Sequence, residues 1–465
     1  MSSVSSLSST NSALNLSAIL EAAFGASSAG IDVNSAVSAS LSAAEQPEFL
    51  WEQQEATIQS QQSALNSLQN NAETLDNDMQ SLNSLLGPLN AVKVASSNSS
   101  IVSASASSGT AAATHVIEVN SLAATDTWAS GTVASASTPL AAGSFTITGA
   151  DGTQTTISTG TGTSTLSDVA STINADGLGV SATVVTDTNG ARLEIVSNTS
   201  GSAANFSVGA GGGLTFSEVT PGANASYSVD GLTLSSASNT VTGAVPGVTL
   251  NLLNASPNTP VTLTVTPDTS QAATAINQFV TDYNTLISAV NTQFADTGSG
   301  EGVLATDPTV RNLQSELLSA LGYTYVPASG STTVSNLSSL GITVNKDGTL
   351  SLDGSTLNNT LENHYGDVQS FFQGAALNGF ANTLDQQLSS FSNPANGAFT
   401  VDLSSMTTQM TGLQTNITNF QTNVIDPLQT QLNNEYSKAE ILLQQLPMQM
   451  KQIDEELGYN SSSNG

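Results

Sequence analysis

The side chains that most often perform catalysis or bind metal ions are sparse in this sequence. It has two histidines, His115 and His364, and we expect neither to lie beside a second candidate metal ligand. A catalytic triad needs a histidine between its nucleophile and its carboxylate. No pair of carboxylates is flanked by apolar residues that would raise a pKa for acid–base work. We therefore expect no enzyme, no catalytic residue, no metal site and no cofactor, and a structural or surface role for both histidines.

Two glycine-containing stretches have some features of ligand-binding loops. Residues 209–213 read GAGGG, but the Lys-Ser/Thr pair of a phosphate-binding loop does not follow and no helix is expected to open there. Residues 345–353 read NKDGTLSLD, and the spacing of their acidic residues and glycine is wrong for a calcium loop. Lys346-Asp347-Gly348 instead predicts the turn of a hairpin.

Composition and charge exclude several classes of protein. The chain has 465 residues, enough for two to four domains, with 6 basic residues against 36 acidic ones and a formal charge of −30. Phosphate groups and anionic lipid surfaces need Lys and Arg, so we expect neither nucleic acid nor a membrane as a partner. There is no cysteine, and the first basic residue is Lys93. We therefore expect no disulfide, no cleaved signal peptide and no membrane-spanning helix.

Both ends of the chain show heptad spacing of apolar residues, which is typical of paired helices. A first helix is expected after Pro47, which suits a first helical turn, and should end near Gly87-Pro88. A second helical stretch begins near Leu403 and is interrupted or bent at Pro427 and Pro447. We expect these two stretches to pack along one intrachain coiled-coil seam, whose residues are Ile58, Leu65, Leu68, Leu75, Met79, Leu82, Leu413, Ile417 and Phe420.

The end of the second stretch lies beyond this break, and its only partner within the chain would be the Ser- and Ala-rich beginning. We therefore expect its apolar residues to make an intermolecular contact, as with another subunit. These residues are Leu443, Leu446, Met450, Ile453 and Leu457.

The middle of the chain has the alternating pattern of half-buried strands. Examples are residues 114–122, 143–149, 191–197, 225–231 and 260–267, with one short helix at 164–177 capped by Ser164 or Ser167. From residue 268 helical spacing returns, followed by helix 307–321 and hairpin 340–353. The expected fold is thus an α+β multidomain chain in which β-rich head domains are inserted into a helical stem.

The expected domains follow from these changes of pattern. Their boundaries are a flexible segment 1–44, a helical leg or stem 45–95 with 268–438, a first β-rich head domain 96–130 with 223–267, a second inserted head domain 131–222, and a C-terminal helix and frayed tail 439–465.

Several stretches resemble one known family. They are GIDVNSAVSASLSAAEQPEFLWEQQ (30–54), SIVSASASSGTAAATHVIEVNSLA (100–123), the run from ASYSVDG (225–231) through PGVTLNLL to VTLTVTPDTS, INQFVTDYNTLISAVN (276–291) and LGITVNKDGTLSLD (340–353). In this order they are similar to the flagellar hook-associated protein 2 family, the filament-capping proteins. The block 131–222 looks like a module that is inserted in flagellin-like proteins.

The resemblance implies a structural and assembly role outside the cell. A protein of this family is secreted unprocessed by the flagellar type III export apparatus, with an export chaperone. It assembles as a closed ring of roughly four to six subunits at the distal tip of the bacterial flagellar filament. There it retains exported flagellin and promotes its folding and insertion, and some members also act as adhesins.

Three alternatives stay open at this stage. Flagellin or a hook–filament junction protein shares the order helix, strands, helix, but the N-terminal pattern of flagellins is absent. A β-rich surface adhesin with a coiled-coil stalk would be supported by a signal peptide or an anchor. A surface glycosidase would need an acid–base pair.

Overall fold

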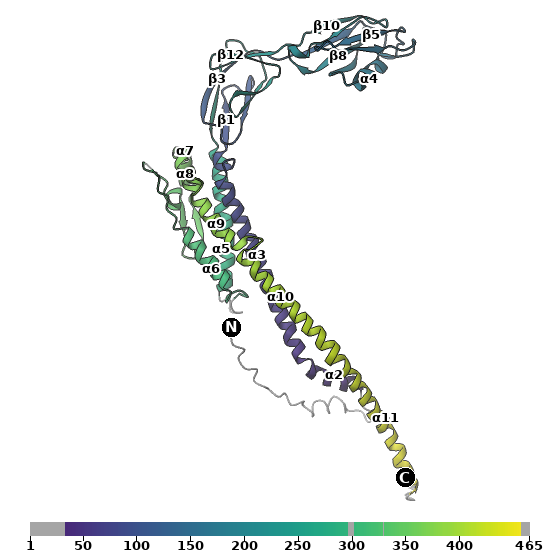
Figure 1. Ribbon diagram of the computed structural model, residues 1–465, viewed down its shortest axis with the longest axis vertical. Coiled ribbons are helices and arrows are strands. Elements are labelled where there is room, and N and C mark those ends of the chain that lie inside the picture. Colours follow the sequence, from purple (N-terminus) through teal and green to yellow (C-terminus); the bar gives the residue numbers. More distant parts are fainter. Residues whose placement is uncertain (1–32, 296–301, 329, 457–465) are drawn as a thin grey trace, which may run out of the picture.

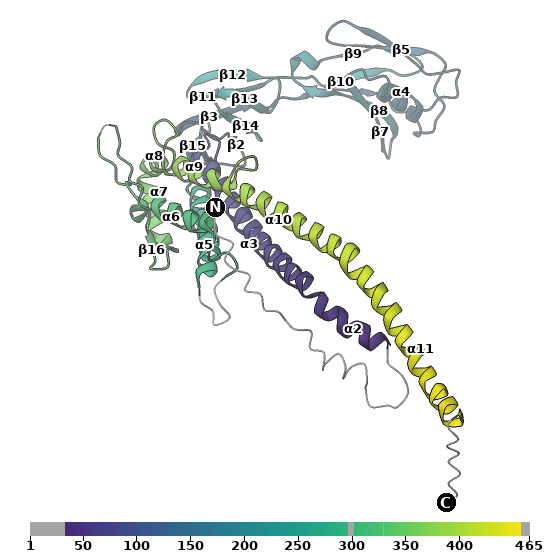
Figure 2. The same cartoon turned by 60° about the horizontal axis from the view of Figure 1, so that its bottom comes forward.

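The structure is a computed structural model that describes residues 33–295, 302–328 and 330–456. A long helical stem runs from the C-terminal end of the described chain to a shorter bundle of helices, and two β-rich modules extend from the far side of this bundle (Figure 1). The turned view in Figure 2 shows the same order, with α10 and α11 following the stem and the β modules at its opposite end. Helices and sheets in separate modules confirm the expected α+β multidomain fold.

Helix α3 (Gln46–Asn83) is the longest helix of the stem and begins where the sequence predicts. Pro47 occupies its first turn, where the missing N–H of proline removes no intrahelical hydrogen bond. The helix ends because Ser84 adopts an extended conformation. Gly87 follows, and a Cβ there would lie only 2.0 Å from the carbonyl oxygen of Ser81. A short 3₁₀ turn, η1 (Pro88–Asn90), then leads the chain into the first β module.

The leg is the bundle in which α3 packs against the helices that follow the β modules. Its buried core joins α3 to these later helices, and the sequence reading overlooked the helices of residues 354–392. The elements are α5 (Thr269–Phe294), α6 (Pro308–Ala320), η3 (Leu337–Leu340), the hairpin β16 (Ile342–Val344) and β17 (Leu350–Leu352), α7 (Gly354–Asn363), α8 (Tyr365–Gln373) and α9 (Phe380–Ser392).

The first β module holds two sheets around one buried core. The five-stranded sheet has the order β1-β15-β3-β11-β12, and the three-stranded sheet has the order β13-β14-β2. All pairs are antiparallel, so one face of each strand can be buried while the other stays polar. The strands are β1 (Val92–Ser96), β2 (Val102–Ala106), β3 (Ala113–Ser121), β11 (Ala225–Val229), β12 (Leu232–Ser236), β13 (Thr240–Val245), β14 (Val248–Leu252) and β15 (Val261–Pro267).

The second β module lies between β3 and β11 in the sequence and has its own core. Its sheets have the orders β10-β4-β8-β7 and β6-β5-β9, and the chain enters and leaves it side by side at the bridge Ala124↔Ala223. The elements are β4 (Thr125–Ser130), β5 (Ser144–Thr148), β6 (Gln154–Ser158), α4 (Leu166–Ala175), β7 (Val180–Asp187), β8 (Gly190–Ser200), η2 (Ser202–Ala204), β9 (Ser207–Val208) and β10 (Phe216–Thr220).

Two details of the modules differ from the sequence reading. Strand β4 pairs with β8 and β10, so the second module starts before the expected boundary at residue 131. The short helix α4 is capped by neither Ser164 nor Ser167. Thr165 caps it through a reciprocal pair of hydrogen bonds with Asp168, which satisfies two free backbone donors instead of one.

The stem continues through α10 (Ala398–Phe420), a π-helical turn η4 (Gln421–Ile425) and α11 (Asp426–Glu456). The break expected at Pro427 is the π turn directly before it, which can absorb an extra residue without ending the helix. Pro447 lies inside α11, so the helix is not interrupted there. Part of the segment 1–44 that was expected to be flexible is helix α2 (Val33–Ala44), and the rest lies outside the described residues.

Burial of the apolar residues of α3 in the leg core yields a first prediction. Leu75 is fully buried in the leg core, whereas Leu86 is 77% exposed. Replacing Leu75 by Ala should lower the free energy of unfolding of the leg by about 2–5 kcal/mol, because the leg cannot fully close the cavity. Urea unfolding followed by the helical circular dichroism signal measures this. Leu86→Ala, the matched control, should change it by less than about 0.5 kcal/mol, and equal effects would contradict the assignment.

Candidate interaction surface on the terminal helices

The structure divides the residues of the expected seam between two environments. Five of them on α3 are completely or almost completely buried in the leg core, beneath α5 and α9 as well as α10; they are Leu65, Leu68, Leu75, Met79 and Leu82. Ile58 on α3 and Leu413, Ile417 and Phe420 on α10 and at its end are only half-buried. The two chain ends therefore meet along the lower part of α3, while its upper part is enclosed by the leg.

The lower contact between α3 and α10 is open and largely polar. A groove of about 770 Å³ runs between them, lined by Leu50, Ile58 and Leu413 among amide and hydroxyl side chains. Gln414 Nε2 donates to Glu55 Oε1 over 2.7 Å, and Gln62 Nε2 donates to Thr407 Oγ1 over 3.1 Å. Exposed hydrogen bonds of this kind orient two helices but stabilise them little.

The junction of α2, α3 and the π turn holds a small buried apolar cluster in the lower stem. Val37 and Leu41 of α2 are buried against Ile425. The ring of Trp51 meets the ring of Phe420 edge-on, with centroids 5.5 Å apart. This junction was not predicted from the sequence, because Ser and Ala dominate the segment. The spacing of Val33, Val37 and Leu41, four residues apart, is a signal that could have found it.

One carboxylate is buried at this junction. Glu48 is only 8% exposed, and its Oε1 accepts a hydrogen bond from Gln421 Nε2 in the first residue of the π turn. Its Oε2 is buried with no hydrogen-bond partner among the described residues. Loss of the hydrogen bond from Gln421 would leave the buried carboxylate of Glu48 without a partner, which is energetically costly. Gln421 therefore helps to fix the register of α3 against the π turn.

Beyond this junction α11 carries exposed apolar side chains. Four of the five residues that the sequence assigned to a subunit or filament contact lie here: Leu443, Leu446, Met450 and Ile453 are 39%, 50%, 59% and 54% exposed. Leu457 lies outside the described residues. Their spacing by three and four residues places the four on one side of the helix. Contiguous exposed apolar surface of this kind is typical of a contact with another protein.

The candidate chemical sites are otherwise few. Contrary to expectation, His115 does lie beside a carboxylate, with its Nδ1 2.8 Å from Asp230 Oδ2. His364 Nδ1 is 3.9 Å from Asp367 Oδ2. Within the described ranges, no three His, Cys, Asp or Glu side chains gather as a metal site would require. No helix in that same part of the chain is both long and apolar enough to cross a membrane.

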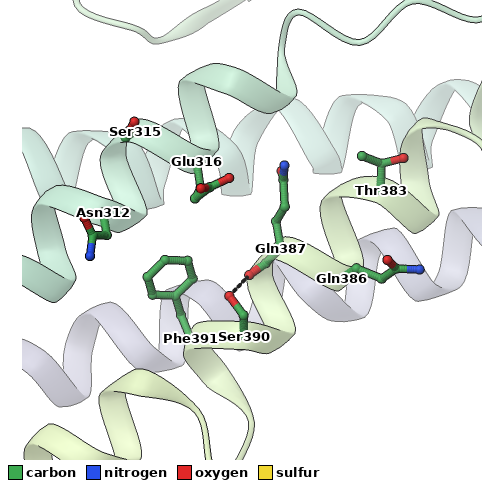
Figure 3. A pocket seen from close by; sticks show the side chains of 8 residues that line it. All are labelled: Asn312, Ser315, Glu316, Thr383, Gln386, Gln387, Ser390 and Phe391. Atoms are coloured by element: carbon green, nitrogen blue, oxygen red, sulfur yellow. Dashed lines mark hydrogen bonds between the residues drawn. The ribbon is translucent and has the colours of Figure 1, made fainter.

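A pocket of about 760 Å³ lies between α6 and α9 (Figure 3). Asn312, Ser315 and Glu316 line it from α6, and the other lining residues come from α9, where Ser390 donates a hydrogen bond to the backbone oxygen of Gln387 over 2.6 Å. Glu316 is the one ionisable side chain in the lining. Acid–base or nucleophilic catalysis needs a second group within hydrogen-bond reach, and this lining does not supply it.

Comparison with known proteins shows which proteins this chain is similar to. The family model of the flagellar hook-associated protein 2 N-terminus matches residues 29–126, and that of its C-terminus matches residues 222–448. The flagellin hook IN motif matches residues 144–199, inside the second β module. The chain is also similar to the solved flagellar cap protein FliD D1-D2-D3 domains from Escherichia coli, with 27% identity and a TM-score of 0.59, covering 74% of this chain and 99% of that one.

Curated relatives agree. The B-type flagellar hook-associated protein 2 of Pseudomonas aeruginosa PAO1 is 33% identical over 313 residues, and the A-type protein of Pseudomonas aeruginosa is 30% identical over 312. These matches cover 60% and 59% of this chain and 65% and 64% of the relatives, slightly less than two thirds of their length.

The α+β multidomain fold, with β modules inserted between helical parts of the chain, together with these matches, defines a flagellar hook-associated protein. Two models of one family match consecutive parts of the chain in the family's own order. The chain belongs to the flagellar hook-associated protein 2 family, which is a family of structural proteins and not a known enzyme family.

The aromatic contact at the junction yields a second prediction. The chain has two tryptophans, so Trp128→Phe leaves Trp51 as the single reporter. In that background Phe420→Ala should expose Trp51, shift its emission to longer wavelength and increase its quenching by acrylamide, because the edge-on contact contributes about 0.5–1.5 kcal/mol. Phe49, which is 52% exposed, provides the control: Phe49→Ala should leave the emission unchanged. An unchanged spectrum in the Phe420 variant would contradict the packing described.

Proposed function

We propose that this protein caps the distal end of the bacterial flagellar filament, where it forms a closed ring that retains exported flagellin and promotes its folding and insertion. Membership of the hook-associated protein 2 family and similarity to a flagellar cap protein support the capping role. The ring, the handling of flagellin and a further role as an adhesin are proposals that rest on this membership and on the geometry of the stem.

The observation that carries the proposal is the course of the helices nearest the two ends of the described chain. Helices α2 and α3 and helices α10 and α11 run along one stem, and the β modules lie at its opposite end (Figure 1). Such a molecule can present its modules as a plate while its stem reaches into a cylindrical structure below. We propose that α3 and α10 act as a coiled-coil stem, in which the groove between them still leaves Ile58 and Leu413 within reach of a partner.

The exposed residues of α11 supply the contact that an assembly needs. Leu443, Leu446, Met450 and Ile453 expose apolar surface, and burying it against a neighbouring subunit or the filament end would be favourable by roughly 25 cal/mol per Å². A heterologous contact whose rotation closes gives a ring. We propose a ring of roughly four to six subunits.

Location and route follow from the same assignment. We propose that the protein is secreted through the flagellar type III export apparatus, accompanied by an export chaperone, and resides at the distal tip of the filament. The absence of cysteine suits this route, because no disulfide hinders the passage of an unfolded chain. Flagellin and the filament end are the proposed partners.

Complementation of a strain that lacks its own filament cap tests the proposal. The full chain should restore filaments and reduce the flagellin that is lost to the medium, as measured by electron microscopy and by immunoblots of culture supernatant. The variant Leu446→Asp/Met450→Asp should still be exported but should lose at least about tenfold of this retention, because each charge opposes burial of the apolar side of α11.

The matched control is Gln444→Asp/Gln452→Asp. These exposed residues lie on the opposite side of α11 from Leu443, Leu446, Met450 and Ile453, beside the exposed Ile441 and Met448. The control therefore adds the same charge away from the four proposed contact residues and should behave like the full chain. Equal loss of flagellin retention in both variants would show that added negative charge, and not the apolar contact, causes the loss. Filaments built from the purified chain without flagellin would replace the capping role with that of a flagellin.

A further inference from the structure

The leg contains two carboxyl groups of α3 that each face another carboxyl group. Asp76 and Asp78 are two residues apart, so their side chains leave the helix about 200° apart and reach different neighbours. Asp76 faces Asp385 on α9, and Asp78 faces Asp282 on α5. Since α5 and α9 are two of the helices that enclose α3, one carboxyl pair lies at each of these helix contacts.

The atoms of these pairs have few other partners. Asp76 Oδ1 and Asp385 Oδ1 are both buried without another hydrogen-bond partner in the described chain, and so is Asp78 Oδ2. Asp76 Oδ2 accepts from Gln80 over 3.2 Å and from Ser389 over 3.4 Å. Two ionised carboxylates repel each other at this range, whereas one shared proton turns the repulsion into a hydrogen bond.

The charges around the pairs do not relieve the repulsion. The other elements in contact with α3 bring Asp402 on α10 and Asp367 on α8, while α2 and η1 carry no titratable residue. Glu73 lies one turn away on α3 itself. Arg311 on α6, the basic residue among the leg helices α5–α9, donates its Nη2 to the backbone oxygen of Ala305 over 2.7 Å. No cation is therefore assigned to either pair among the described residues.

The protonation behaviour agrees with this geometry and corrects the expectation that no pair of carboxylates would have a raised pKa. Burial raises the pKa of Asp76 to about 7, with the hydrogen bond and charge of Asp385 adding to the effect. Burial and Asp282 likewise raise the pKa of Asp78 to about 7. A carboxyl group whose pKa is higher in the folded protein than in the unfolded chain stabilises the fold at low pH, and this contribution is lost as the pH rises from about 4 to about 7.

We propose that Asp76 with Asp385 and Asp78 with Asp282 are two proton-sharing clasps, which hold α3 against α9 and α5 in acidic medium and loosen these contacts as the medium becomes neutral to alkaline. The device acts on the leg and not on the β modules, whose cores are separate. It goes beyond the capping role and does not depend on it, since it concerns the cohesion of one subunit.

Amide hydrogen exchange of the full chain, followed by mass spectrometry, tests the proposal. After correction for the intrinsic effect of pH, protection of peptides from α3, α5 and α9 should fall about tenfold between about pH 5 and about pH 8, a loss that partial exposure of the pairs keeps moderate. Peptides from β7 and β8 serve as the internal reference and should keep their protection. A leg whose protection follows that reference at both pH values overturns the proposal.

Two sets of variants separate the clasps from other titrating groups. Asp76→Asn/Asp78→Asn keeps hydrogen-bonding side chains but removes the two carboxyl groups of raised pKa, so it should abolish most of the pH dependence and protect the leg at about pH 8. Asp282→Asn/Asp385→Asn removes the facing charges but leaves Asp76 and Asp78 buried, so it should reduce the dependence without abolishing it. Failure of one variant to fold leaves the other as the test.

His364 is the matched control, because it is an ionisable side chain of the leg, at the N-cap of α8, and belongs to neither clasp. His364→Gln should keep the pH dependence of the full chain. Loss of the dependence in His364→Gln, or its undiminished persistence in both Asn variants, would show that the clasps are not its origin.

Discussion

Burial of one narrow apolar stripe on α3 is the constraint on which the leg and stem depend. A helix of 38 residues that is mostly Gln, Asn and Ser outside its stripe cannot be stable alone in water, because most helical stability in proteins comes from packing. The covering helices all come from more than 180 residues later in the sequence. The chain therefore runs through both β modules between the two parts of the leg. The leg core is built from long-range contacts, which form slowly.

Much of the architecture could be predicted from residue patterns because its elements are long or strictly periodic. The heptads of α3, the stripe of α5 and the alternation in β3, β8 and β15 each depend on one buried face. The helices α7, α8 and α9 were missed because each is short and amphipathic, with its partners distant in sequence. Likewise, α2 was read as flexible because Ser and Ala obscure the positions of Val37 and Leu41.

The interaction surface was harder to predict because spacing alone does not identify the partner. Leu65 and Leu75 have the same heptad spacing as Ile58, yet α5 and α9 enclose the first two while the third borders an open groove. Glu48 and Asp76 were unremarkable as acidic residues in a polar helix, and only the approach of Gln421 and Asp385 gives them a role. Tertiary contacts, not local propensity, decide which apolar residues of α3 are buried and which of its acidic residues acquire partners.

The bridge between Ala124 and Ala223 has an evolutionary consequence. Because the chain enters and leaves the second β module at neighbouring points, the whole module is a cassette. A recombination event that removed it or exchanged it for another would leave two strand ends already close enough for a short loop to join. Selection can thus diversify the second β module while the leg and stem stay unchanged.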